Sequence, residues 1–161
     1  MRTISKYTLK KATEHIFYEA WMFYQTLIFL TKSKNQIEVN ILLDAFSIHA
    51  RNLFYFLYPK KHVKPDDILV FDYIKNGKAF NMHKTKKKDL MFIVRKTDKQ
   101  TAHLTYARNR YNSKTKPWPF LEIGKKIHKT LDSFYNNLHD SYRSLPYIIK
   151  LKKVIDTYSN I

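Results

Sequence analysis

The chain contains no cysteine and only two glycines and five prolines in 161 residues. Without cysteine it forms neither disulfides nor thiolate metal sites, and it lacks a thiol nucleophile. Glycine and proline mark most turns, so their scarcity disfavours a sheet of many short strands. Apolar residues instead recur every three to four positions over long segments, which predicts helices. We therefore expect an all-α protein of a reducing compartment, the cytoplasm.

Several signals of familiar chemistry are also missing. The sequence has no glycine-rich phosphate loop, no nucleophile elbow and no zinc-protease motif. The pairs His15 with Glu19 and His128 with Asp132 supply only two metal ligands each, so we interpret them as surface pairs. The N-terminus lacks the apolar region of a signal peptide. The most apolar run, residues 16–30, is shorter than the roughly 20 residues of a membrane span. We expect no metal, no cofactor and no membrane partner.

Negative charge is scarce as well. Thirty Lys and Arg stand against 13 Asp and Glu, which gives a net charge of +17, while 44% of the residues are hydrophobic and 16% aromatic. A chain this apolar folds, and its length suits a single domain spanning 1–161. Its charge attracts phosphate-rich partners, with RNA or another polyanion first among them. The alternative is a solvated surface, since a genome rich in A and T also inflates lysine.

The first two predicted helices are the most regular. The first covers Thr8 to Thr31. The second starts after Asn35, whose spacing to Glu38 resembles a capping box, and it runs to about Tyr58 before Pro59. The first helix is apolar over much of its circumference, as expected of a central helix or of a subunit contact. Its second apolar row, a candidate homodimer contact, consists of Phe17, Trp21, Tyr24 and Ile28.

The rest of the chain predicts two or three further helices. The connection from Pro59 to Thr85 is long and only partly ordered, with a short helix after Pro65 that Gly77 ends or follows. A third helix is expected over Lys87 to Arg108, and its polar middle, residues 95–100, should protrude or break. A fourth has Pro119 in its first turn, and a fifth has Ser144 as its N-cap and Pro146 in its first turn. The expected fold is an up-down bundle of four to five helices.

His49 is the first candidate for chemistry. A rotation of 100° per residue places it within about 60° of Leu42, Phe46, Leu53 and Phe56, in the middle of an apolar face. A polar ring there needs a partner. It is either a core histidine bonded to Tyr, Thr or a backbone carbonyl, or a general acid or base in a cleft.

Two neighbours and a second cluster complete the catalytic candidates. Arg51 lies on the opposite face of the predicted helix from His49, and Asn52 lies at the edge of the apolar stripe. The second cluster contains His103, Tyr106 and Arg108, and we expect it to lie beside the first because consecutive helices are often neighbours. The alternative is a buried polar network that fixes helix register.

Lysines form the candidate nucleic-acid surface. The densest run holds Lys84, Lys86, Lys87 and Lys88, and the fourth predicted helix adds Lys125, Lys126 and Lys129. Trp118, if exposed near them, is a stacking platform for single-stranded RNA. Only convergence of these side chains on one side of the fold distinguishes a binding surface from a solvated one.

Three segments carry a resemblance to known families. Residues 42–53 read Leu-Leu-Asp-Ala-Phe-Ser-Ile-His-Ala-Arg-Asn-Leu, followed later by His103-Leu104-Thr105-Tyr106 and Trp118-Pro119-Phe120. This pattern resembles an uncharacterised family of small bacterial helical proteins and, more distantly, the HEPN helical bundles. HEPN ribonucleases carry an Arg followed, after about four to six residues, by a His. The resemblance implies a helical architecture and an RNA partner.

The HEPN catalytic pair itself is not present. Seven residues separate Arg95 from His103, and ten separate Arg51 from His62. We therefore transfer no catalytic residue. The leading hypothesis is a non-enzymatic helical module that binds RNA through its lysines. The alternatives are a metal-independent ribonuclease that uses His49 or His103, and an interaction protein that acts as a homodimer.

Overall fold

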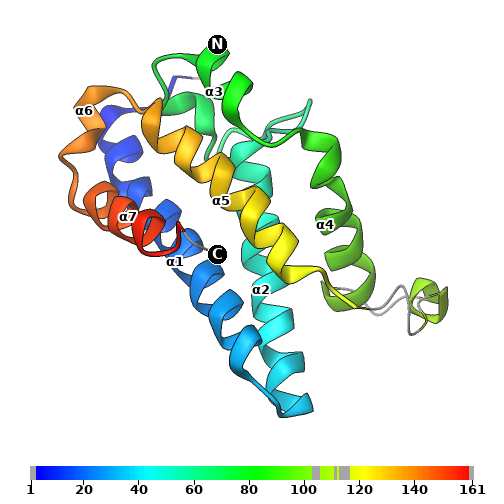
Figure 1. Cartoon of the computed structure of the whole chain (residues 1–161). Helices are drawn as coiled ribbons and strands as arrows, with labels where there is room; N and C mark the ends of the chain where they lie inside the picture. The colour runs from blue at the N-terminus through cyan, green and yellow to red at the C-terminus, as the bar shows by residue number, and fades with distance from the viewer. Residues whose placement is uncertain (1–2, 103–105, 111, 113–116, 160–161) are drawn as a thin grey trace.

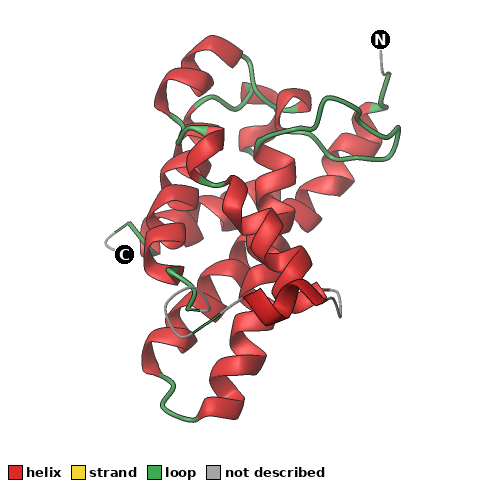
Figure 2. Cartoon of the chain, turned by 90° about the vertical axis from the view of Figure 1, so that its right-hand side faces the viewer, coloured by secondary structure: helices red, strands yellow, loops and turns green. Residues whose placement is uncertain are grey.

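The computed structural model describes residues 3–102, 106–110, 112 and 117–159 (Figures 1 and 2). These residues form seven α-helices and no strand, apart from a single antiparallel bridge between Ile74 and Leu138. The all-α prediction is confirmed. The predicted number of four to five helices is wrong, because several observed helices have only four to seven residues. Helices this short do not show a hydrophobic period in the sequence.

A long helical hairpin forms one layer of the fold. It consists of α1, Lys6–Lys32, and α2, Gln36–Leu57. The Asn35 side chain caps α2 by accepting the amide hydrogens of its first turn. Glu38 does not complete the predicted capping box, since it accepts a hydrogen bond from the Ser33 hydroxyl at 2.7 Å. α2 ends before Pro59, as predicted.

Two helices pack on one face of this hairpin (Figure 1). α5, Phe120–Asn136, lies on α2, and α7, Pro146–Thr157, lies on α1. Together they cover Phe17 and Tyr24 of the predicted dimer row of α1. The ring of Phe17 lies 5.9 Å from that of Tyr147, and Tyr24 is fully buried with its ring 4.7 Å from that of Tyr158. Phe17 and Tyr24 therefore pack within the chain, as the central-helix interpretation predicts, while Trp21 of the same row is exposed.

The connection between α2 and α4 differs from the prediction. No helix starts after Pro65, because the Asp67 carboxylate accepts the Lys64 amide hydrogen at 2.8 Å and closes a turn. A 3₁₀ turn follows at Val70–Asp72, and then α3 at Gly77–His83. Gly77 opens that helix, since the side chain of the preceding Asn76 caps it.

The predicted third helix over 87–108 is broken into pieces. A 3₁₀ turn at Lys87–Asp89 precedes α4, Met91–Lys96, which passes into a π-helical turn at Thr97–Ala102 and, farther on, a 3₁₀ turn at Tyr106–Arg110. The break falls in the polar stretch where one was expected. Thr97 itself does not protrude, because it is buried and its hydroxyl donates toward the carbonyls of Ile93 and Ser47.

The C-terminal part is close to the predicted layout. Pro119 is the N-cap of α5, one position before its expected place, and Pro146 opens α7 as expected. The N-cap of α7 is Leu145, not Ser144, and the extra helix α6, Asp140–Arg143, joins α5 to α7. None of the helices in the described ranges is long and apolar enough to cross a bilayer.

Candidate functional site

Six lysines from two distant segments line one open cavity of about 640 Å³. One wall is the stretch between α3 and α4, and the other is the middle of α5. We call this cavity the lysine groove. Among the described residues that line it, Asp89 is the one acidic residue. Its cationic residues are Lys84, Lys86, Lys88, Lys125, Lys126 and Lys129.

A buried polar network holds the two walls together. The Thr85 amide donates to the Thr130 hydroxyl of α5 at 3.2 Å, and the Thr85 hydroxyl donates to the Lys126 carbonyl at 2.9 Å. The Tyr58 hydroxyl, at the end of α2, donates to the Thr85 carbonyl at 2.6 Å and lies 3.0 Å from the Thr130 hydroxyl. Burial raises the pKa of Tyr58 to about 12, so this donor keeps its proton at neutral pH. The network therefore fixes the lysine-rich stretch against α5.

Lys84 is one of the two half-buried cations of the groove, the other being Lys126. Its Nζ lies 4.9 Å from the centre of the Tyr58 ring and 4.7 Å from that of Phe80, within the range of cation–π attraction. Burial lowers the pKa of Lys84, and the neighbouring charge of Lys87 lowers it further. An anion that enters the groove would oppose both effects, since it stabilises the charged ammonium.

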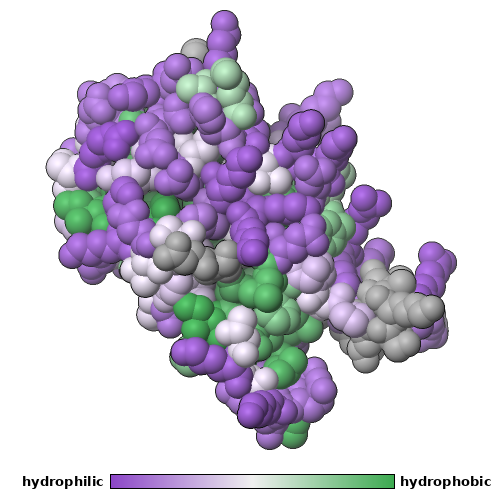
Figure 3. Space-filling model, viewed as in Figure 1, coloured by the Kyte–Doolittle hydropathy of each residue, from purple (hydrophilic) through white to green (hydrophobic). Residues whose placement is uncertain are grey.

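The groove continues along α5 toward its C-terminal end. Lys129 also lines a second cavity of about 470 Å³, together with His83, Asp132, Asn136 and other residues of α3 and α5. The hydrophilic character of this side is visible in Figure 3, where polar side chains cover the area between α5 and α4. The lining of this second cavity is of mixed charge, because it includes Asp132 as well as Lys129.

Two of the predicted nucleic-acid residues lie outside the groove. The Lys87 ammonium donates to the Pro59 carbonyl at 3.2 Å and does not line the cavity. Trp118 is only 6% exposed, and the Lys96 ammonium covers its ring at 5.2 Å. The prediction of Trp118 as a stacking platform is wrong, because its ring packs in the core and its free face is taken by Lys96.

His49 finds a partner that the sequence analysis did not consider. Its Nδ1 lies 2.7 Å from Oε2 of Glu19 on α1, and its ring packs edge-on against Tyr18. At 9% exposure it is a core histidine, but one satisfied by a carboxylate in place of a hydroxyl or carbonyl. Arg51 lies on another face of α2, as predicted, where its guanidinium pairs with Asp98 at 3.1 Å. His49 and Arg51 therefore do not share a site.

Most of the second predicted cluster lies outside the described residues. His103 lies outside the described residues, as does the side chain of Arg108. Tyr106 is described and is 94% exposed, so its hydroxyl is not part of a buried network. Within the described ranges, no group of three or more His, Asp or Glu side chains is placed to hold a metal ion.

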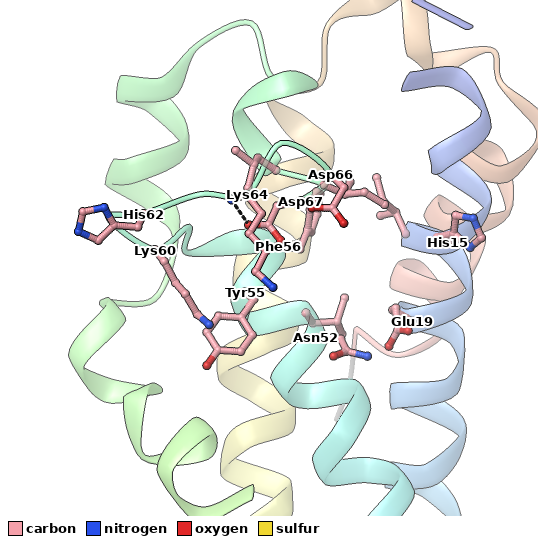
Figure 4. Close-up of a pocket in the computed structure, with 14 residues that line it drawn as sticks. His15, Glu19, Asn52, Tyr55, Phe56, Lys60, His62, Lys64, Asp66 and Asp67 are labelled. Carbon is pink, nitrogen blue, oxygen red and sulfur yellow. Dashed lines mark hydrogen bonds between the residues drawn. The ribbon is translucent and has the colours of Figure 1, made fainter. Parts of the chain in front are cut away.

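A further cavity of about 470 Å³ opens between α1, α2 and the residues after α2 (Figure 4). Asn52 contributes to it, along with His15 and Glu19 of α1. The connecting stretch supplies residues of both signs, and the full charged set is Glu19, Lys60, Lys64, Asp66 and Asp67. With opposite charges so mixed, this mixed-charge cavity lacks the positive field that a polyanion requires.

Sequence reasoning found the lysines but missed the groups that place them. Tyr58, Thr85 and Thr130 are separated by 27 and 45 residues, so no local spacing links them. Comparison of the chain with protein-family models, curated proteins and solved structures finds no match. The resemblance to HEPN bundles thus stays a prediction.

Proposed function

We propose that this chain binds nucleic acid, RNA foremost, through the lysine groove. The observation that carries the proposal is the convergence of Lys84, Lys86 and Lys88 with Lys125, Lys126 and Lys129 around one cavity that has a single acidic lining residue. If the lysines were only a solvated surface of a +17 protein, the stretch between α3 and α4 would not need to be fixed against α5. A rigid cationic groove, in contrast, suits an extended polyanion, since binding releases its condensed counterions.

The chemistry of the groove favours phosphate contacts over base reading. In the part of the chain that the structure describes, no aromatic residue lines the groove, and the Tyr58 and Phe80 rings beside Lys84 are buried. Base stacking on exposed rings is therefore not available within the groove. Lysine ammonium groups bind phosphate as point charges without sequence preference. We infer a sequence-tolerant binder of the RNA backbone.

The test is RNA binding by fluorescence anisotropy across a salt series. If the groove neutralises about four phosphates of a single strand, affinity should fall roughly fiftyfold between about 0.05 and 0.2 M salt. A flat salt dependence, or no binding near 0.1 M salt, would remove the proposal, because phosphate contacts must weaken as salt rises.

A matched pair of double variants locates the binding. Lys125→Gln with Lys129→Gln removes two exposed groove lysines four residues apart on α5. Lys6→Gln with Lys10→Gln removes two exposed lysines with the same spacing on α1. We expect the groove variant to bind roughly 25-fold more weakly at about 0.1 M salt, with a salt slope smaller by about 1.4, and the control to change little. Equal losses in the two variants would assign binding to net charge alone.

A further inference from the structure

Charge is unevenly distributed between the α1–α2 hairpin and the rest of the chain. Residues 12–31 contain no Lys or Arg, and residues 35–59 contain only Arg51. These two stretches carry four acidic residues, Glu14, Glu19, Glu38 and Asp44, so their net charge is −3 in a chain of +17. The charge of Arg51 is itself compensated by Asp98. The whole hairpin, residues 6–57, also includes Lys6, Lys10, Lys11, Lys32 and Lys34 and carries a net charge of +2, whereas the rest of the chain carries +15.

The same hairpin exposes large apolar side chains. Those of Tyr18 and Phe29 on α1, and of Ile37, Ile41 and Ile48 on α2, are all exposed, and we call them the hairpin patch. Tyr18 and Phe29 are 11 residues apart, as are Ile37 and Ile48, and 11 residues make three helical turns. On each helix these side chains therefore form a row along one side of the helix.

The two rows lie on the same outer side of the hairpin. The Tyr18 ring packs against the His49 ring at the seam between α1 and α2, and Ile48 projects about 100° away from His49 toward the exposed side of α2. A rotation of 100° per residue places the α2 row more than about 90° from Phe54, which faces the interior. α5 and α7 cover the opposite side, and the end of the hairpin extends beyond both (Figures 1 and 2).

We propose that the hairpin patch binds a second copy of this chain in a symmetric dimer, with hairpin against hairpin. Two molecules of charge +17 repel each other, and they approach at least cost through the part of the chain with the least positive charge, which is the hairpin. Burial of the paired apolar rows supplies the attraction, since a twofold axis places each side chain in the interface twice. RNA is a less suitable occupant of this face than of the lysine groove, because the hairpin carries only +2 of the chain's +17.

Salt separates this proposal from the RNA proposal. Screening weakens the repulsion between two +17 molecules, so dimerisation should strengthen from about 0.1 to about 0.5 M salt, whereas RNA binding should weaken over the same range. The experiment is sedimentation equilibrium of nuclease-treated protein over a concentration series at both salt levels. Nuclease treatment is needed because bound RNA could bridge two copies.

The structure offers a closely matched control. Ile48 in the patch is 47% exposed, and Ile149 on α7, outside the patch, is 45% exposed, and both are helical isoleucines. We expect Ile48→Glu to weaken dimerisation at least about a hundredfold, because the symmetric interface loses two isoleucines and gains two charges. Ile149→Glu, which changes the net charge equally, should dimerise like the wild type. Ile41→Glu should repeat the effect of Ile48→Glu, with helix content checked by circular dichroism.

Three results would overturn the proposal. One is a wild-type chain that stays monomeric at high concentration and high salt, which would leave the patch to a different protein. Another is an Ile149→Glu variant that loses association as strongly as Ile48→Glu. The third is association that continues past the dimer without closing, since a twofold interface is saturated by two copies.

Discussion

Replacing Thr130 with valine tests whether the polar network builds the lysine groove. The side chain is fully buried, and its hydroxyl accepts the Thr85 amide hydrogen at 3.2 Å beside the Tyr58 hydroxyl at 3.0 Å. Valine preserves the shape but leaves the Thr85 N–H without its partner. An unsatisfied buried donor costs about 1–3 kcal/mol. At about 2–4 °C per kcal/mol for a chain of this size, the Tm should fall by roughly 4–8 °C for a loss near 2 kcal/mol.

Thr26→Val is the matched control. Thr26 is also buried, but its hydroxyl donates only to the carbonyls of Met22 and Phe23 within α1. Those carbonyls already accept helical hydrogen bonds, so valine leaves no donor unpaired and should change stability by less than about 0.5 kcal/mol. The assay is thermal unfolding by circular dichroism for the two variants and the wild type.

The same two variants report on binding. With Thr85 released, the stretch that carries Lys84, Lys86 and Lys88 loses its fixed distance from α5, so RNA affinity should fall in Thr130→Val and not in Thr26→Val. Equal Tm losses in the two variants would refute the assigned role of the Thr85 contact. A destabilised Thr130→Val that still binds RNA like the wild type would show that the groove does not need this network.

Two further predictions concern histidines. Burial lowers the pKa of His128 below its ordinary 6.5, against the opposing charges of Asp132 and Asp156, and its Nδ1 lies 2.8 Å from the Tyr24 hydroxyl. The folded state thus prefers the neutral His128 ring, so the stability that this ring contributes is complete above about pH 6.5 and is lost as the pH falls below that value. Urea unfolding over a pH series should show this loss of stability in the wild type and less of it in His128→Asn. Any RNA cleavage by the chain should disappear in His49→Ala combined with His103→Ala, and cleavage that survives this double variant excludes the ribonuclease alternative.

Much of the fold follows from local patterns in the sequence. The long apolar rows of α1 and α2, the Asn35 cap and the Pro59 stop are all signals within one helix or at its ends, and they place both helices within about two residues. The polar stretch 95–100 predicts the break in the expected third helix, but it does not predict that Thr97 is buried with its hydroxyl directed toward the Ser47 carbonyl of α2. A contact of that kind links residues 50 positions apart.

The candidate site, too, is predictable from the sequence only in part. Composition identifies the lysines, but their convergence depends on Thr85 and Thr130, which no helical period connects. The partner of His49 illustrates the same limit. Its apolar surroundings correctly predict a buried ring that needs a hydrogen bond, yet Glu19 belongs to another helix and lies 30 residues away. Sequence patterns state what a side chain requires, and only packing decides which residue meets the requirement.

The two proposed surfaces are compatible because they lie on different elements. The lysine groove is built from α5 and the stretch between α3 and α4, and the hairpin patch belongs to α1 and α2. A dimer through the patch therefore leaves both grooves open and places two of them on one particle. An RNA long enough to reach both grooves binds the second at a raised effective concentration, so its affinity exceeds that of a short oligonucleotide. Loss of the dimer then weakens binding of long RNA while a single groove keeps its affinity for a short one.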